Sequence, residues 1–167
     1  KNIKGILFDM DGTVLDSEQL FEQAQIALLK DYNIKTNRKK LSEFKGMSYK
    51  DFYPRFIKKF NIDSKIEFMR LKLRMYLHKS MEKNLKYING FESFYKTILK
   101  NSNIKRGLVT NTTRQTYQKI QSCINIDKYF KSVVTATEAK RPKPSPIPYL
   151  QAMNELNLNT KNTLIIE

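Results

Sequence analysis

The sequence of 167 residues is poor in the side chains that build disulfides, histidine-based metal sites and membrane spans. Cys123 is the only cysteine, which excludes an internal disulfide and fits a reducing, cytoplasmic compartment. His78 is the only histidine, so metal sites with several imidazoles are excluded, and no nucleophile-elbow sequence supports a serine triad. No apolar run approaches the roughly 20 residues of a membrane span. We therefore expect a cytoplasmic protein with no membrane partner.

Acidic residues are also scarce, because 16 Asp and Glu face 31 Lys and Arg, which gives a net charge of +15. Such a charge invites a nucleic-acid partner. Most of it is lysine spread along the chain, and the densest cluster, Arg38-Lys39-Lys40, is short and has no interleaved aromatic residue. We interpret the charge as surface composition that would also attract phosphate esters, and we expect no nucleic-acid partner.

Four short apolar runs predict buried parallel strands, and helical spacing between the later runs predicts crossover helices. This alternation is typical of an α/β fold with a Rossmann-like parallel sheet. The predicted strands are Ile3 to Phe8, Arg106 to Val109, Lys131 to Val134 and Thr163 to Ile166. The apolar helix faces are Phe91, Phe94, Tyr95 and Ile98, then Tyr117 and Ile120 after the possible N-cap Thr112-Thr113, then Tyr149, Leu150, Met153 and Leu156 after Pro146 and Pro148.

Residues 17–86 predict helices and no strand. A capping-box pattern at Ser64 to Glu67 precedes a long helix. The segment is too long for a simple crossover, so we expect a helical cap domain at 17–86 inserted into a core of 1–16 and 87–167. Its apolar positions with helical spacing are Leu20, Ala24, Ala27 and Leu28, then Leu73 and Leu77.

Polar residues follow each predicted strand. In an open parallel sheet the carboxyl ends of the strands meet at one edge, where ligands bind. Residues far apart in the sequence should therefore converge there. They are Asp9 and Asp11, Thr110 and Asn111, Thr135, Lys143 in a proline-rich loop, and Glu167.

Asp9 and Asp11 have the spacing and chemistry for phosphoryl transfer. Asp9 can attack phosphorus as a carboxylate nucleophile. Asp11 faces the same way in an extended chain, so it can act as general acid and later as general base. Gly12 lets the backbone turn sharply after them.

The remaining strand-end residues suit a phosphate and a hard metal ion. Thr110 and Asn111 can donate hydrogen bonds to phosphate oxygens, and Lys143 can supply a fixed positive charge. Asp9, Asp11 and Glu167 form an oxygen-rich set, so we expect Mg²⁺ as the cofactor.

Four stretches in this order resemble the four motifs of the haloacid dehalogenase-like hydrolases: FDMDGTVLDSE, GLVTNTT, RPKPSPIPYL and TLIIE. The helical insertion resembles the cap of the beta-phosphoglucomutase and phosphoglycolate phosphatase branch. The resemblance implies Asp9 as nucleophile, Asp11 as acid/base, Thr110 as phosphate ligand and Lys143 as the charge-stabilising lysine. It places the metal on Asp9, the main-chain carbonyl of Asp11, and Glu167.

The cap adds further expectations. Lys45-Gly46-Met47-Ser48 resembles the cap loop that contacts substrate, which makes Gly46 and Ser48 candidate substrate-binding residues. A simple helix-helix turn explains Gly46 equally well. Asp16 and Ser17 are interpreted as hinge and helix-cap residues, and Lys72 as a lysine on a solvated face.

The sequence departs from the family's pattern at three places. Pro142 stands where the third motif usually has glycine, and Ile147 where it usually has aspartate. Phe21 aligns with the catalytic histidine of the mutases. The family pattern continues after Glu167 with an aspartate and more strands, so we expect the functional protein to be longer, with the last predicted strand at the centre of its sheet.

These features predict a Mg²⁺-dependent phosphatase for a small phosphorylated metabolite, acting through an aspartyl-phosphate. One alternative is a sugar-phosphate mutase, which Phe21 disfavours. A second is a catalytically silent relative that acts as a binding or scaffold protein, which the altered third motif favours. A monomer is the favoured state.

Overall fold

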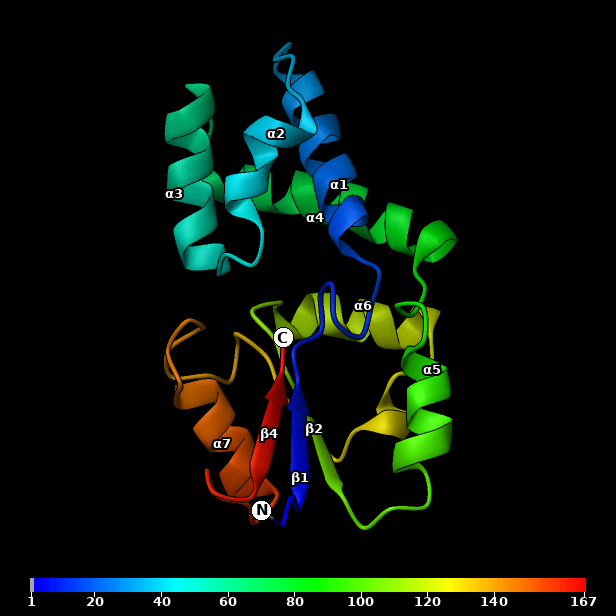
Figure 1. The fold of residues 1–167 in the computed structure, drawn as a ribbon. Coiled ribbons are helices and arrows are strands. Elements are labelled where there is room, and N and C mark those ends of the chain that lie inside the picture. Colours follow the sequence, from blue (N-terminus) through cyan, green and yellow to red (C-terminus); the bar gives the residue numbers. More distant parts are fainter. Residues whose placement is uncertain (1) are drawn as a thin grey trace.

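The computed structural model describes residues 2–167 and folds into a parallel sheet beneath a group of helices (Figure 1). The strands are β1 (Gly5–Phe8), β2 (Lys105–Val109), β3 (Ser132–Val134) and β4 (Thr163–Ile166). The helices are α1 (Glu18–Asp31), α2 (Arg38–Leu41), α3 (Tyr49–Phe60), α4 (Ile66–Asn84), α5 (Phe91–Phe94), α6 (Arg114–Cys123) and α7 (Ile147–Glu155). Two 3₁₀ turns, η1 (Ser42–Phe44) and η3 (Asp127–Tyr129), and a π-helix, η2 (Tyr95–Leu99), complete the elements.

All three strand pairings are parallel, in the order β3-β2-β1-β4. The α/β fold predicted from the sequence is thus confirmed, and each predicted strand is present. The last strand lies beside β1, but at an edge of the sheet formed by residues 2–167 rather than at its centre. Leu164 is accordingly 47% exposed, so its apolar side chain does not contribute to the buried core.

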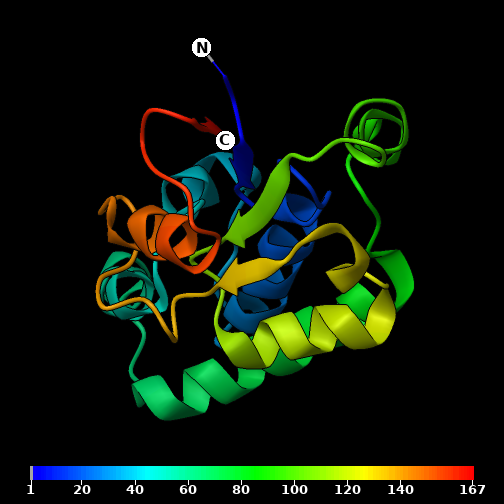
Figure 2. The same ribbon diagram turned by 90° about the horizontal axis from the view of Figure 1, so that it is seen from below.

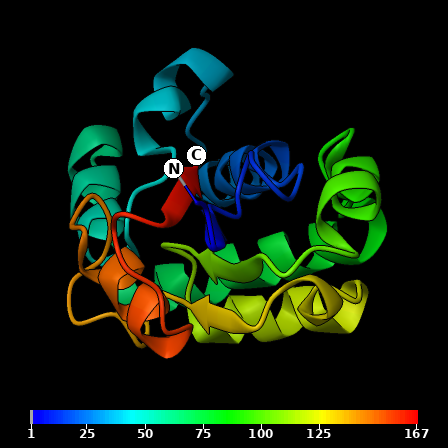
Figure 3. The same ribbon diagram turned by 60° about the horizontal axis from the view of Figure 1, so that its bottom comes forward.

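Strand β1 is a continuous apolar run, because both of its faces are covered. Ile6 and Phe8 pack in the larger apolar cluster with residues of α5 and α6. Leu7 faces the opposite side, in a second cluster with Tyr149 and Met153 of α7. Figures 2 and 3 show α7 and α5 on opposite sides of the sheet.

Two predicted helix faces need correction. Ile98 is 56% exposed and Leu99 is 1% exposed, because the π-helical turn of η2 has a wider period that brings Leu99 inward. In α7, Leu150 is 47% exposed, since Tyr149, Met153 and Leu156 already share the face that packs on the sheet. Spacing alone did not separate these adjacent positions.

The insertion consists of α1, α2, α3 and α4 with one 3₁₀ turn, and its described residues contain no strand, as predicted. Leu20, Ala24 and Leu28 of α1 are buried with Leu73 and Leu77 of α4. The predicted capping box is not formed. Helix α4 starts at Ile66 with Lys65 in the N-cap position, so Ser64 lies one residue too early to cap it.

The chain enters and leaves the insertion at one place. Leu15 pairs with Tyr87 in an isolated antiparallel bridge, and the Asp16 amide donates to the Lys86 carbonyl at 3.0 Å. Apolar packing continues from β1 into α1 through this neck. No helix among residues 2–167 is long and apolar enough to cross a membrane.

Candidate active site

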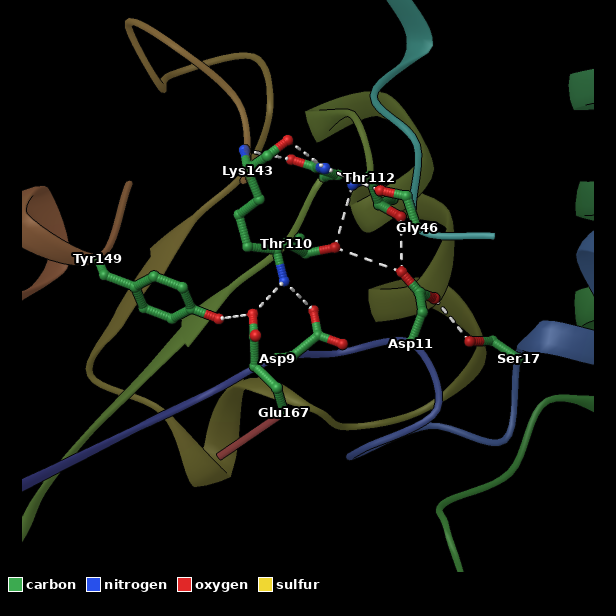
Figure 4. A network of polar contacts seen from close by, with 10 residues as sticks. Asp9, Asp11, Ser17, Gly46, Thr110, Thr112, Lys143, Tyr149 and Glu167 are labelled. Atoms are coloured by element: carbon green, nitrogen blue, oxygen red, sulfur yellow. Dashed lines mark hydrogen bonds and ion pairs between the residues drawn. The ribbon is translucent and has the colours of Figure 1, made fainter. Parts of the chain in front are cut away.

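The carboxyl ends of the strands face a pocket of about 730 Å³ between the sheet and the insertion. Asp9, Asp11 and Lys143 line it from the sheet side, and Phe21 and Ser48 line it from the insertion. Figure 4 shows the polar groups at its floor. The expected convergence therefore occurs for most of the residues named from the sequence. Thr135 is the exception, because it is buried and donates to Glu138 at 2.5 Å instead of lining the pocket.

Asp9 is held by a lysine from a distant loop. The Lys143 Nζ donates to Asp9 Oδ1 at 2.5 Å and to Glu167 Oε1 at 3.3 Å. The Tyr149 hydroxyl donates to the same Glu167 oxygen at 2.5 Å (Figure 4). This bond and the Lys143 charge lower the pKa of Glu167, while burial and the Glu167 bond raise the pKa of Tyr149. Glu167 is thus an anion and Tyr149 a neutral donor at neutral pH.

Asp11 is held by hydroxyl groups instead of a cation. Ser17 Oγ donates to Asp11 Oδ1 at 2.6 Å, while Thr112 Oγ1 and Thr110 Oγ1 donate to Oδ2 at 2.9 and 3.3 Å. Burial raises the pKa of Asp11, and so does the nearby Asp9 charge, while the three hydroxyl bonds oppose the rise. A carboxyl with a raised pKa can hold a proton and donate it, which is what a general acid requires.

A tight turn separates the two aspartates from the insertion. Gly12 has a φ of +82°, and a Cβ there would stand 3.0 Å from the Glu18 carboxylate. The Gly12 amide donates to the Leu15 carbonyl at 2.8 Å. The predicted role of Gly12 in turning the chain is therefore confirmed.

Ser17 has a different role from the one predicted. It occupies the N-cap position of α1, but its side chain makes no capping bond, and it is completely buried with its hydroxyl on Asp11. The sequence predicts Thr112 only as part of a helix N-cap and Tyr149 only on an apolar helix face, so neither is predicted as a site residue. No local signal marks these contacts, because each partner is brought in by the tertiary fold.

The Thr110 hydroxyl is used inside the site. Thr110 is 2% exposed, and its hydroxyl accepts from the Thr112 amide at 3.0 Å while donating to Asp11. The neighbouring Asn111 and Thr113 line the pocket instead. Thr113 is also the N-cap of α6, and its side chain accepts from the Thr116 amide. A phosphate-binding role for Thr110 remains a prediction.

Asn111 joins three segments. Its Nδ2 donates to the carbonyls of Gly46 at 2.9 Å and Lys143 at 3.0 Å, and its Oδ1 accepts from the Lys143 amide at 2.9 Å. Gly46 turns the loop with a φ of +69°. Ser48 is 2% exposed and donates to Asp51 at 2.8 Å. The cap loop predicted to contact substrate thus borders the pocket and is tied to the sheet through Asn111.

The predicted metal site uses the main-chain carbonyl of Asp11 beside the carboxylates of Asp9 and Glu167, and it remains a prediction. No group of three His, Cys, Asp or Glu side chains in the described part of the chain is placed to hold a metal ion. The Asp11 carboxylate faces Ser17 and Thr112, which leaves its main-chain carbonyl as its only contribution to such a site. Asp9 and Glu167 do meet, on either side of the Lys143 ammonium (Figure 4). Their oxygen donors fit a hard cation such as Mg²⁺.

A parallel sheet lies beneath a helical insertion, and its first strand ends in two differently held aspartates, so the class of protein is an α/β fold whose polar side chains gather at the carboxyl ends of its strands. The chain belongs to the haloacid dehalogenase-like hydrolases, because the model of that family matches residues 6–167. This membership confirms the resemblance predicted from the four motifs, and with it the prediction of an enzyme, a phosphatase of that family.

Individual proteins agree with this membership. The pyrophosphatase PpaX of Oceanobacillus iheyensis is 27% identical over 99% of this chain and 74% of its own length. A beta-phosphoglucomutase structure from Clostridium difficile superposes with a TM-score of 0.81 at 23% identity, covering 99% of this chain and 76% of its own. A phosphate complex of CbbY from Rhodobacter sphaeroides gives 0.80 at 19%, covering 98% and 76%. The two structures share the fold of this chain.

Proposed function

We propose that this protein is a Mg²⁺-dependent phosphatase that hydrolyses a small phosphate monoester through an aspartyl-phosphate on Asp9. Asp9 attacks phosphorus, and Asp11 protonates the leaving oxygen. Asp11 then removes a proton from the water that hydrolyses the intermediate. One observation carries the proposal: the two aspartates, with a single residue between them, have different partners. Asp9 contacts an ammonium group, whereas Asp11 contacts hydroxyl groups and has a raised pKa.

Lys143 and Asn111 position the reacting groups. The ammonium of Lys143 neutralises Asp9 and Glu167 and offers positive charge to a phosphoryl group at the pocket floor. Asn111 fixes the main chain of Lys143 through two hydrogen bonds. A phosphate entering this site would compete with Asp9 for the same ammonium. Lys143 can therefore stabilise the negative charge of the phosphoryl oxygens while the Asp9 carboxylate bonds to phosphorus.

Asp9, Glu167 and the Asp11 carbonyl are the groups that we propose to hold Mg²⁺. When bound, the ion would neutralise phosphate charge and so favour attack by an anionic carboxylate. The family to which the chain belongs and the oxygen-only donors of Asp9 and Glu167 support this assignment.

The mutase alternative is less well supported. Phe21 lines the pocket at the position that aligns with the mutase histidine, and a phenyl ring cannot transfer a proton. The PpaX relative is named as a pyrophosphatase, which favours hydrolysis at phosphorus over transfer within a sugar phosphate. The silent-scaffold alternative predicts no turnover under any condition.

The decisive test is Asp9→Asn with and without metal. The amide cannot form the acyl phosphate, so turnover of p-nitrophenyl phosphate should fall on the order of 10³-fold or more. In the unmodified protein, activity should vanish with a chelator and return with Mg²⁺. Asp63→Asn, an exposed change on the insertion, serves as the control and should retain full activity. Near-normal turnover by Asp9→Asn, or full activity in chelator, would refute the mechanism.

A further inference from the structure

Four acids line the pocket from the insertion, and three of them have basic partners, while the fourth, Asp51, accepts from the Ser48 hydroxyl. The three arginines of the lining have no ion pair among residues 2–167, and one of them, Arg55, is exposed. Glu18 pairs with Lys45 at 2.9 Å. Glu22 pairs with Arg38 at 3.4 Å, and Glu43 pairs with Lys59. These carboxylates therefore have their counter-ions within the insertion itself.

Arg70 and Arg74 have no such counter-ion. Both line the pocket from α4, one helical turn apart, and both are half-buried. No ion pair among residues 2–167 includes either guanidinium group. Two like charges at this spacing destabilise a helix, so an unmatched pair facing a cavity calls for an anion from outside the chain.

An aromatic ring holds one of the two guanidinium groups at the pocket wall. The Arg70 guanidinium lies over the Tyr49 ring, 5.2 Å from its centroid. Burial raises the pKa of Tyr53, and the charges of Arg70 and Arg74 oppose that rise, so both arginines lie near the Tyr53 hydroxyl. A stacked guanidinium keeps its N–H groups available in the plane of the fork.

We propose that Arg70 and Arg74 bind a second anionic group of the substrate, which is then a small phosphate ester with a phosphate or carboxylate at its other end. The proposal rests on the proposed function, because Asp9 and Lys143 must hold the reacting phosphate at the floor of the same pocket. The cavity of about 730 Å³ is of the size that holds one small metabolite. Guanidinium groups match both phosphate and carboxylate by paired hydrogen bonds.

Pairs of substrates that differ only in the second anionic group measure the contribution of that group. Fructose 1,6-bisphosphate is compared with fructose 1-phosphate and fructose 6-phosphate, and 3-phosphoglycerate with glycerol 3-phosphate. The first comparison tests a second phosphate and the second tests a carboxylate. We expect kcat/KM to be higher for the doubly anionic member of at least one set, and the better set identifies the preferred anion.

Matched variants then assign the preference to the arginines. Arg70→Gln/Arg74→Gln should lower kcat/KM for the preferred doubly anionic substrate on the order of 10- to 100-fold, mainly through KM, since charged hydrogen bonds are lost. Singly anionic substrates should change by no more than about threefold, a margin well below one charged hydrogen bond. Lys79→Gln/Lys83→Gln removes two exposed charges with the same spacing on the same helix, away from the pocket, and should change neither. Arg70→Lys/Arg74→Lys should restore part of the preference.

The inference and the proposed function fail in different ways. Turnover of every substrate without a preference for a second anion, or an equal loss on all substrates in the arginine variant, would overturn the inference and leave the phosphatase intact. Absence of all turnover would overturn the proposed function. In that case calorimetric binding to Asp9→Asn decides the inference: tighter binding of the doubly anionic ligand that depends on Arg70 and Arg74 supports it, and equal affinities overturn it.

Discussion

Asp9 and Asp11 show how neighbouring side chains of one type acquire different chemistry. The Asp9 carboxylate accepts a hydrogen bond from the Lys143 ammonium at 2.5 Å. Asp11 has only neutral hydroxyl donors and little water, so its neutral form gains in relative stability. The difference between their partners supports the proposed division into a nucleophile, Asp9, and a proton donor, Asp11.

Ser17→Ala should move the pH profile of catalysis. The Ser17 hydroxyl donates to Asp11 and lowers its pKa, so its loss should raise that pKa further. Any limb of the kcat profile that reports Asp11 should then shift to higher pH, with KM little changed. The measurement is kcat against pH, and Ser17→Thr, which keeps the hydroxyl, is the control. An unchanged profile in the alanine variant would remove Ser17 from the positioning of Asp11.

Asp11→Asn should stabilise the protein at neutral pH. The folded-state pKa of Asp11 lies above its ordinary value of 3.8, so the carboxyl contributes stability below that value and loses it as the pH rises through the folded-state pKa. Asparagine does not titrate. The gain in free energy of unfolding should therefore be small near pH 4 and larger at pH 7. Urea denaturation in chelator measures this, and a gain that is the same at both pH values would contradict the raised pKa.

The π-helix η2 is the element whose packing departs most from an α-helical reading of the sequence. A wider turn puts Leu99 into the core beneath the sheet and leaves Ile98 facing outward. The segment connects α5 to β2, so its register also sets where β2 begins. Truncating Leu99 and Ile98 separately can test which of the two side chains is buried.

Leu99→Ala and Ile98→Ala test this register as a matched pair. Leu99 is 1% exposed, so its truncation leaves a cavity and should cost about 2–5 kcal/mol of unfolding free energy. Ile98 is 56% exposed, and its truncation should change stability by no more than about 0.5 kcal/mol. Urea denaturation gives both values. Equal losses would mean that the segment is an ordinary α-helix with Ile98 packed inward.

The whole molecule has one neck between the sheet and the insertion. The Leu15–Tyr87 bridge and the Asp16–Lys86 hydrogen bond place both connections side by side, which is the geometry of a hinge. Outside the neck, the two parts are joined by the Asn111–Gly46 bond at the pocket wall and by the Lys119–Glu82 ion pair, which would have to rearrange during such a motion. We therefore predict that residues 17–86 move as a cap domain over 1–16 and 87–167.

Ligand binding should bring the two parts closer. Dyes placed by Lys58→Cys on α3 and Asn154→Cys on α7, in a Cys123→Ser background, report the distance across the pocket by energy transfer. Inorganic phosphate with Mg²⁺ should shorten it, because closure removes water from the bound anion. A second pair within the sheet-bearing part, Lys100→Cys and Asn154→Cys, should not change. An unchanged distance across the pocket would mean that the insertion and the sheet form one rigid body.

The local sequence by itself determined the strands and most helices, and it named the groups that we propose to react. Apolar runs of strand length indicate the strands, and apolar residues with helical spacing indicate the helices between them, because the pattern of a buried face repeats within one short segment. Strand ends converge by topology, so Asp9 and Lys143 could be paired from the sequence although 134 positions separate them. The four motifs in order then indicated the family.

Only the tertiary structure decided which atoms those groups contact. The Asp11 carboxylate could have joined Asp9 and Glu167, but burial of Ser17 and the packing of α6 turn it toward three hydroxyls. The unmatched charges of Arg70 and Arg74 appear only once the insertion is folded over the sheet. Contacts of this kind depend on how two distant segments meet in space, and neither propensity nor periodicity within one segment carries that information.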